Sequence, residues 1–292
     1  MKKKDIYIWA CDFKDYTGEG NLGRLFVKEL KSKYKFRVFL NSRINLNNPY
    51  ISIFKGIIFC WRQYLNKKKV CYLNYLPFWN FTIFLLLPPK TILGPITGGA
   101  AYLDTGIKNI FIRGFLFPIF YKFSELLLIF RDTELIFSTK LLKKYLSSTT
   151  IKKSKFNYVI KNFKFKKKRK KSIDFLIYYK KHKNKVSFFP TNLIYKLIKN
   201  GFKINIVGDN LDIPSVKNYG YISRNKMSYL QSITKYTLAS GENFLSLFII
   251  ECISHHVKVI SNCKEKFDEP FIVKNTINLN FKKNINLKKL IN

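Results

Sequence analysis

Acidic residues are scarce in this sequence of 292 residues, and their scarcity sets its charge. Asp and Glu number 17 against 54 Lys and Arg, which gives a formal net charge of +37 spread over both halves of the chain. Such a surface suits nucleic acid, anionic lipid or a diphosphate substrate. Only 8 of the positive residues are Arg. Because nucleic-acid readers rely on Arg forks for phosphate and guanine, we expect no nucleic-acid partner.

Cysteine and histidine are also few, and their spacing argues against two kinds of site. The five cysteines are widely spaced without a C-x-x-C pair, which opposes a disulfide framework or a zinc site and fits a reducing cytosol. Of the three histidines, His255 and His256 are adjacent, and adjacent helical residues diverge by about 100°, which makes a poor chelate. No D-x-D motif occurs either. We therefore expect neither a metal nor a cofactor.

No apolar run is long enough to span a membrane, which needs about 20 mostly uncharged apolar residues. The run at 81–87 is short, and the run at 110–130 is interrupted by Arg113, Pro118, Lys122 and Glu125. The basic start of the chain is followed by too short an apolar stretch for a secretory signal. We expect a cytoplasmic protein, and an amphipathic surface helix would allow peripheral attachment at the inner membrane.

Strand and helix signals alternate along both halves of the chain. In the first half we expect strands at 5–10, 36–40, 70–75, 91–94 and 134–138, with helices at 22–33, 51–66, 78–87 and 108–131. In the second half we expect strands at 174–179, 203–207, 216–222 and 236–240, with helices at 188–199 and 226–232. This alternation predicts an α/β protein with two Rossmann-like domains of parallel strands and helical crossovers.

A basic run separates the two halves. Residues 161–172, KNFKFKKKRKKS, contain eight basic residues, which opposes a packed core and predicts a solvated linker. Attraction to an anionic membrane surface is compatible with this, since each such residue gains about 1 kcal/mol near acidic lipids. The predicted domains are 1–160 and 173–292, joined by the linker 161–172.

The most informative segment is 236–262, YTLASGENFLSLFIIECISHHVKVISN. It predicts a strand, a polar loop, an apolar helix and a second strand. Glu251 lies inside the apolar helix, and a buried carboxylate needs a partner because its charged form loses water's hydrogen bonds. A polar loop that leads into a helix N-terminus suits an anionic ligand, because free N–H groups and the helix dipole point there.

This segment resembles the nucleotide-sugar site of GT-B glycosyltransferases, particularly glycosyltransferase family 4. In that family a loop glutamate and a helix glutamate are separated by seven residues. Here eight residues separate Glu242 from Glu251, and the family's first-glutamate position falls on Asn243, so both Glu242 and Asn243 are candidates for this catalytic position. The resemblance implies that Glu251 binds the donor ribose, and that Ser246 and Leu247 offer backbone N–H groups to the diphosphate.

The chain departs from the family pattern after this helix, where His255-His256 replaces the usual small pair ending in glycine. The family also carries an Arg and a Lys that neutralise the departing diphosphate. Here Lys180 and Lys185, after the first strand of the second domain, are the candidates, with Lys in place of Arg. A fixed cation lowers the barrier because cleavage builds negative charge on the leaving group.

Two glycine-rich stretches extend the resemblance. Gly18–Gly23 formally matches G-x-G-x-x-G, but the loop before it is long and no acid ends the second strand, so an NAD or FAD site is disfavoured. As the glycine-rich loop of a GT-B enzyme it would place Gly20 and Asn21 against the donor. The other stretch, 94–99, is similar to the GPIGGG-type loop of bacterial polysaccharide glycosyltransferases.

That second stretch implies an acceptor site. Its Thr97, Gly98 and Gly99 would face the acceptor, and Asp104 would orient an acceptor hydroxyl. Together these features imply a transferase that moves a sugar from a nucleotide-sugar donor to a lipid-linked oligosaccharide or a surface polysaccharide such as O-antigen or capsule. Retention of configuration and independence of metal follow from the resemblance. The first domain would hold the acceptor and meet an anionic membrane surface, and the second would hold the nucleotide.

Two alternatives belong to other classes. A non-catalytic basic protein of the same fold could bind anionic membrane or polymer, and the altered first-glutamate position and the missing Arg favour it. An NAD-dependent sugar-modifying enzyme would need Gly18–Gly23 packed against the first strand and an acid near Asn41.

Overall fold

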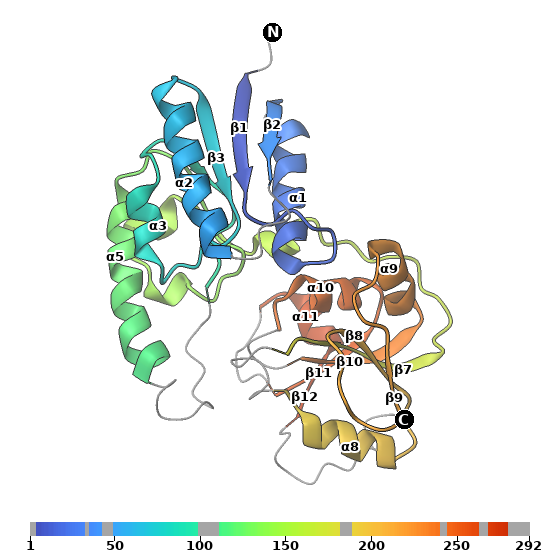
Figure 1. The fold of residues 1–292 in the computed structure, drawn as a ribbon. Coiled ribbons are helices and arrows are strands. Elements are labelled where there is room, and N and C mark those ends of the chain that lie inside the picture. The colour runs from blue at the N-terminus through green and yellow to red at the C-terminus, as the bar shows by residue number, and fades with distance from the viewer. Residues whose placement is uncertain are drawn as a thin grey trace. The chain divides into compact units, whose positions relative to one another are not determined.

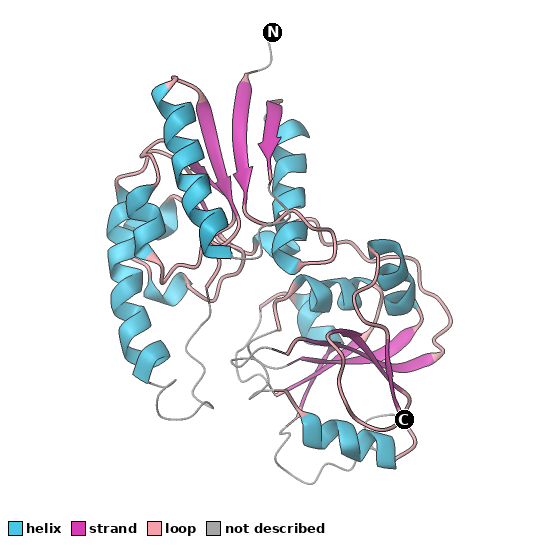
Figure 2. Ribbon diagram, in the orientation of Figure 1, coloured by secondary structure: helices cyan, strands magenta, loops and turns pink. Residues whose placement is uncertain are grey.

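The computed structural model describes residues 4–32, 35–42, 49–98, 111–181, 189–239, 244–262 and 268–279. The chain divides into two compact units, Met1–Lys161 and Asn162–Asn292 (Figure 1). Each unit is built on a parallel β-sheet with helices packed against it (Figure 2). Within the described ranges, none of the helices combines the length and the apolarity needed to cross a bilayer.

The main sheet of the first unit has the strand order β2-β1-β3-β4, with all pairs parallel. Its strands are β1 (Asp5–Ala10), β2 (Arg37–Asn41), β3 (Lys69–Leu73) and β4 (Ile92–Leu93). The connecting helices are α1 (Gly18–Ser32), α2 (Pro49–Leu65) and α3 (Phe81–Leu86). The predicted strand at 5–10 is confirmed: it lies inside the sheet, with Ile6 and Ile8 fully buried.

A helical layer and a small second sheet complete this unit. A π-helical turn, η1 (Ile112–Leu116), runs into α5 (Phe117–Ile129). Pro118 lies in the first turn of α5, and because proline has no N–H it cannot continue the α-helical ladder through this point. After it come β5 (Leu135–Ile136), η2 (Lys143–Tyr145), α6 (Ser148–Lys152), β6 (Ser154–Lys155) and η3 (Tyr158–Ile160), with β5 and β6 paired in parallel.

A buried arginine joins α3 to the end of α5. Arg131 is 6% exposed, and its guanidinium donates to the carbonyls of Phe84 at 2.5 Å, Leu87 at 3.0 Å and Pro88 at 2.8 Å. These carbonyls lie at or beyond the C-terminal end of α3, where a helix leaves acceptors unpaired. Burial lowers the pKa of Arg131 to about 10, so the side chain remains charged at neutral pH.

The second unit contains one parallel sheet in the order β12-β11-β10-β7-β8-β9. Its strands are β7 (Ile173–Tyr179), β8 (Ile204–Gly208), β9 (Val216–Asn218), β10 (Thr234–Ala239), β11 (Lys258–Ser261) and β12 (Thr276–Asn278). Its helices are α8 (Thr191–Lys199), α9 (Arg224–Ser232), α10 (Leu247–Ser254) and α11 (Pro270–Asn275). Every residue of β8 is buried, as expected for a strand covered on both faces.

The basic run between the halves is mostly exposed, as predicted for a solvated segment, but it also contacts the second unit. We call residues 162–172 the strap, because they lie along the second unit. Phe163 stacks on Phe271 with ring centroids 3.8 Å apart, and Phe165 stacks on His256 at 5.0 Å. The backbone N–H of Lys166 donates to the carbonyl of Ser254 at 2.8 Å. The two aromatic residues supply the packing that the lysine-rich composition alone does not predict, while most of the lysines stay exposed.

Candidate functional site

The carboxyl edge of the second sheet brings together three segments that carry polar groups. Parallel strands end at the same edge, and open α/β sheets bind ligands there. β7 is the neighbour of both β10 and β8. It ends at Tyr179 and is followed by Lys180, while β8 ends at Gly208 and β10 leads towards the start of α10. The sequence-predicted residues Lys180, Ser246, Leu247 and Glu251 therefore belong to adjacent segments.

Asp209 fixes the turn in which Lys180 lies. One carboxylate oxygen of Asp209 accepts the N–H of Lys181 at 2.6 Å, and the other accepts the hydroxyl of Tyr221 at 2.7 Å. The Tyr221 hydrogen bond lowers the pKa of Asp209, and the Lys181 N–H and the charges of Lys180 and Lys181 add to that effect, against burial. The carboxylate is therefore ionised and holds the ends of β7 and β8 together.

Gly208 permits this close approach. Its φ is +104°, and a Cβ at this position would lie 2.2 Å from the carbonyl oxygen of Tyr179. Only glycine avoids that clash. Gly208 and Asp209 were not predicted as site residues. A Gly-Asp pair directly after a buried strand does indicate a tight polar turn at the carboxyl edge of a sheet.

The start of α10 is the positive end of a helix dipole, and Ser246, Leu247 and Phe248 there are half-buried. Ser246 is the N-cap, and its hydroxyl oxygen accepts the N–H of Ile249 at 3.4 Å. Phe244 and Leu245 are buried just before it and anchor the entry into the helix. The first N–H groups of a helix have no acceptor within it. Those of Leu247 and Phe248 can therefore donate hydrogen bonds to an acceptor at the carboxyl edge of the sheet. The predicted helix start is confirmed.

Glu251, in the second turn of α10, finds its partner on another helix. Its carboxylate forms an ion pair and a hydrogen bond with the guanidinium of Arg224, the first residue of α9. The Glu251 side chain is 18% exposed and that of Arg224 44%. Burial raises the pKa of Glu251 even though Arg224 opposes that rise. The expectation of a partner outside the helix is confirmed, but Arg224 lies 27 positions away in sequence and nothing in the sequence singles it out.

The two adjacent histidines close the other end of α10. His255 is the C-cap, and His256 follows with a φ of +61°, at the position where the resembled family has glycine. Stacking on Phe165 and a 2.8 Å contact between its Nε2 and the carbonyl oxygen of Lys166 hold the His256 ring. This pair is part of the fold of α10 and the strap. Within the described ranges, no three metal-ligating side chains gather at one place.

In the first unit, Gly20 and Asn21 are committed to local structure. The predicted glycine loop is wrong in form, because α1 begins at Gly18 and Gly18–Gly23 is its first turns. The Gly20 N–H donates to Thr17 Oγ1 at 3.1 Å, and a Cβ on Gly20 would lie 2.1 Å from the carbonyl oxygen of Lys14. Asn21 Nδ2 donates to the carbonyl of Asp15 at 2.8 Å. Thr17 thus starts the helix earlier than the glycines suggested.

Thr97 and Gly98 lie in an extended segment instead of an open loop. Thr97 donates its N–H to Leu76 at 2.9 Å and accepts from the N–H of Phe78 at 2.6 Å. A Cβ on Gly98 would lie 2.9 Å from Leu142 Cδ1, so Gly98 packs closely against that side chain. Five other sequence-predicted residues lie outside the described residues: Gly99, Asp104, Lys185, Glu242 and Asn243.

A further polar group in the first unit was missed by sequence reasoning. Asn74 and Tyr75, directly after β3, both have positive φ, at 68° and 47°. Asn74 is 3% exposed, and its Nδ2 donates to the carbonyl of Glu19 at 2.5 Å. Burial raises the pKa of Tyr75 to about 12, with contributions from the charges of Asp12 and Glu19. A strained turn with nearby acids therefore marks the carboxyl edge of this sheet as well.

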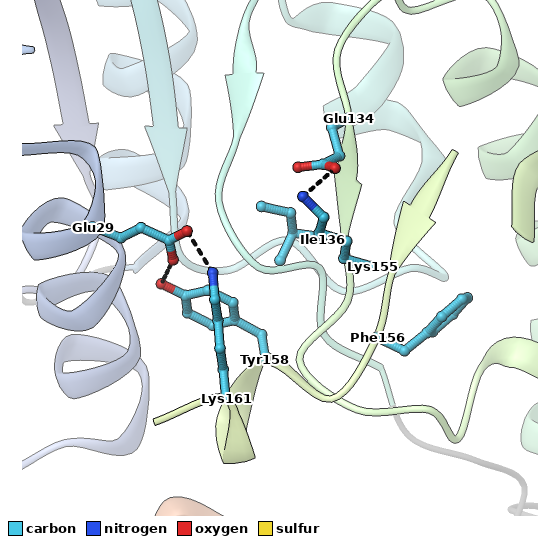
Figure 3. A pocket seen from close by; sticks show the side chains of 7 residues that line it. All are labelled: Glu29, Glu134, Ile136, Lys155, Phe156, Tyr158 and Lys161. Atoms are coloured by element: carbon cyan, nitrogen blue, oxygen red, sulfur yellow. Dashed lines mark hydrogen bonds and ion pairs between the residues drawn. The ribbon is translucent and has the colours of Figure 1, made fainter. Parts of the chain in front are cut away.

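The first unit also holds a hollow of about 220 Å³ (Figure 3). Its carboxylates are both paired: Glu134 with Lys155 at 2.5 Å, and Glu29 with Lys161 and with the hydroxyl of Tyr158. Because both carboxylates already have cationic partners, they are not available to bind a charged ligand. We interpret the hollow as a packing gap where α1 meets the segments around β5 and β6.

Comparison with known proteins places the fold. No protein-family model matches the sequence, and no curated protein matches it. The UDP-GlcNAc 2-epimerase of Methanocaldococcus jannaschii, solved with UDP-GlcNAc and UDP, is similar in structure, with a TM-score of 0.51 and 12% identity over 99% of this chain and 91% of that chain. Spinosyn forosaminyltransferase SpnP gives a TM-score of 0.47 at 6% identity, over 94% of this chain and 83% of its own.

At these sequence identities the structural similarity bears on the fold alone. The fold is assigned from the epimerase, because the TM-score of SpnP is below 0.5. The chain has a GT-B type fold of two Rossmann-like units, as the alternation of strands and helices predicted.

Proposed function

We propose that this protein is a glycosyltransferase that transfers a sugar from a nucleotide-sugar donor to a lipid-linked oligosaccharide or surface polysaccharide. The observation that carries the proposal is the arrangement at the carboxyl edge of the second sheet. There a capped helix N-terminus at Ser246, a cation at Lys180 and a carboxylate at Glu251 come from adjacent segments of one unit. A nucleoside diphosphate has the matching groups, namely an anionic diphosphate and ribose hydroxyls.

The diphosphate would lie at the start of α10. The N–H groups of Leu247 and Phe248 and the helix dipole favour an anion there, and Lys180 adds a charge. Glu251 lies within the same helix and can accept hydrogen bonds from ribose hydroxyls, and its ion pair with Arg224 opposes the rise in its pKa that burial causes. In this proposal Lys185 adds a second cation, and Glu242 or Asn243 faces the transferred sugar.

Transfer breaks the bond between the anomeric carbon and the diphosphate oxygen and forms a bond from that carbon to an acceptor oxygen. Negative charge develops on the departing diphosphate, whose oxygen takes up the proton that the acceptor hydroxyl loses. Fixed cations and N–H dipoles stabilise that charge, which is the role a metal ion plays in other designs. The acceptor is assigned to the first unit, through Thr97, Gly98, Gly99 and Asp104. Retention of configuration and membership of family 4 are parts of this proposal that come from the resemblance of 236–262.

Thermal unfolding with a panel of nucleotides tests the proposal. UDP, GDP, CMP and their sugars are compared on wild type, Glu251→Ala and Glu251→Gln, with Glu134→Ala as a matched control in the first unit. A ligand at about 100 times its Kd stabilises by about 2.7 kcal/mol. We expect one nucleoside diphosphate to raise the melting temperature of wild type and Glu134→Ala but of neither Glu251 variant.

Other outcomes reassign the protein. If no nucleotide changes the melting temperature while anionic polymer does, the proposal is wrong, and the hypothesis of a non-catalytic basic protein is supported instead. If a nucleotide sugar binds and is converted without an acceptor into an epimer, the activity is epimerisation, as named for the M. jannaschii protein, instead of transfer.

A further inference from the structure

The outward side of α2 is apolar where a soluble helix is normally polar. Its exposed large side chains are Ile51, Phe54, Ile58, Trp61 and Leu65, and Phe54 and Leu65 are 64% and 72% exposed. Their spacing of three and four residues places them on one stripe. The inward side is also apolar, with Ile57 and Cys60 buried. The helix therefore shows an apolar surface both to the core and to the outside.

The helix formed by η1 and α5 repeats this pattern. Phe115, Ile119, Phe123 and Leu126 are exposed at intervals of three or four residues, with Phe115 at 58% and Leu126 at 54%. The short helix α3 adds Leu85 and Leu86, which are 59% and 48% exposed.

These three stripes are joined into one surface. Trp61 Nε1 donates to the carbonyl of Leu86 at 2.7 Å, which places α2 beside α3. The ring of Phe81, on α3, lies 5.6 Å from that of Phe123 on α5. Figure 1 shows α2, α3 and α5 on the same side of the first unit. We call the exposed apolar side chains of α2, α3 and η1–α5 the apolar face.

Among the described residues, the exposed charges carried by α2 and α5 are all positive, and the first exposed acid beyond α5 is Asp132. Lys55 and Arg62 are exposed on α2, Lys90 follows α3 and Lys122 is exposed on α5. The only acid in these helices is Glu125, which is 4% exposed and accepts hydrogen bonds from the Ser147 N–H and from Lys122. The face therefore combines large apolar side chains with cations and presents no exposed carboxylate on its helices.

We propose that the apolar face docks this protein onto the surface of an anionic phospholipid bilayer. Apolar side chains would enter the boundary between headgroups and acyl chains, and Lys55, Arg62 and Lys90 would contact lipid phosphates. The charge pattern favours lipid over a second copy of the chain, because two copies would bring these cations together without acids to pair them. The proposal concerns a surface of the first unit and does not depend on the proposed transferase site of the second.

Vesicle sedimentation tests it on the full-length protein. Vesicles of phosphatidylglycerol mixed with phosphatidylcholine are compared with pure phosphatidylcholine, at a salt concentration that screens long-range attraction of the whole basic chain. The test variant is Phe54→Ser/Phe115→Ser/Leu126→Ser. The matched control is Tyr195→Ser/Tyr229→Ser/Val273→Ser, which removes three exposed large side chains from the second unit. We expect the test variant to bind the mixed vesicles at least about tenfold more weakly than wild type and the control to bind equally well.

A second variant separates lipid charge from apolar insertion. Lys55→Glu/Arg62→Glu keeps the apolar side chains, and we expect it to lose most of the preference for phosphatidylglycerol. Unchanged melting temperatures establish that the variants are folded. Equal vesicle binding by wild type and the triple variant overturns the proposal, because attachment would then come from the general basic charge. Absence of wild-type binding, with a dimer in solution that the triple variant breaks, overturns it in favour of self-association.

Discussion

Individual charged side chains in this protein serve backbone groups as often as they serve each other. Arg131 donates to carbonyls at the end of α3, and Glu125 accepts the N–H of Ser147 at 2.5 Å just before α6. Burial works to raise the pKa of Glu125, but the hydrogen bonds from Ser147 and Lys122 outweigh it and lower that pKa. A buried ion that satisfies backbone groups at helix ends is costly to remove, because the backbone group is then left unpaired.

Replacing Glu125 by alanine tests this at the scale of one residue. We expect Glu125→Ala to lower the free energy of unfolding by about 2–3 kcal/mol, because it leaves the Ser147 N–H without its acceptor. Glu134→Ala removes an ion pair between half-exposed side chains and should cost about 0–1 kcal/mol. Urea unfolding measures both. Since the folded pKa of Glu125 is lowered, the excess loss should be present above its ordinary value of 4.5 and shrink in stronger acid. Equal losses in the two variants would contradict this account.

His255 is a second group whose pKa the fold lowers, and its effect on stability can be tested separately. Its Nε2 lies 3.0 Å from Lys166 Nζ and 3.0 Å from Ser228 Oγ. Burial, with the nearby charges of Lys166 and Lys171, lowers its pKa from 6.5 to about 4. The unfolded chain therefore takes up a proton more readily than the folded chain, and stability falls as the pH drops from 6.5 to 4.

The variant His255→Gln isolates that group. Wild type should lose unfolding free energy between pH 6.5 and pH 4, and we expect the variant to lose up to about 3 kcal/mol less. Urea unfolding at both pH values measures this difference. The same pH dependence in wild type and variant would show that His255 is not responsible.

At the scale of elements, the strap shows how a basic segment becomes ordered. Its lysines mostly project into solvent, while Phe163 and Phe165 face Phe271 and His256. Lys171 also reaches back, with its Nζ 2.7 Å from the carbonyl oxygen of His255 and 3.2 Å from that of Ser232. The strap thus covers the C-terminal end of α10 and the end of α9.

Two double variants of the full chain separate packing from charge in the strap. We expect Phe163→Ala/Phe165→Ala to lower the unfolding free energy of the second unit by about 1–3 kcal/mol, since each aromatic pair contributes about 0.5–1.5 kcal/mol beyond its buried area. Lys167→Ala/Lys168→Ala removes two exposed lysines from the same segment and should change it by less than about 0.5 kcal/mol. Thermal unfolding gives both values. A larger effect of the lysines would mean that charge holds the strap.

The elements also show what sequence reasoning can reach. Apolar runs such as 5–10 predicted the central strands, because local pattern and burial coincide there. The start of α1 was misplaced, because the glycines at 18 and 20 hide a helix that Thr17 caps. The exposure of the strap was predicted, but its contacts with the second unit were not, because they depend on two aromatic residues among seven basic ones. Glu251 was correctly expected to have a partner, but pairing with Arg224 depends on how α9 packs on α10, which no local pattern encodes.

For the whole molecule, the scarcity of acids has a structural counterpart. Ion pairs occupy acids in both units: Asp5, Glu29, Glu125, Glu134, Asp174 and Glu251 each pair with a Lys or Arg. Most of the positive charge is therefore left on the surface. The fold class could be predicted from the sequence, because alternation of strands and helices specifies parallel sheets. For the candidate donor site, the sequence predicted which strand ends and which helix start contribute to it. It did not predict the side-chain partners, such as Arg224 for Glu251.

The parallel strand order of the second unit has a consequence for synthesis of the chain. β7 is the first strand of its sheet to be made, and it ends up between β8 and β10. Its pairing with β8 can form once β8 itself has left the ribosome, but its other edge stays open until Thr234–Ala239 has also emerged. An apolar strand with an open edge is a template for pairing with other chains. Nascent chains that stall before Thr234 should therefore be the species most dependent on chaperones, whereas those that stall after β11 have already enclosed β7.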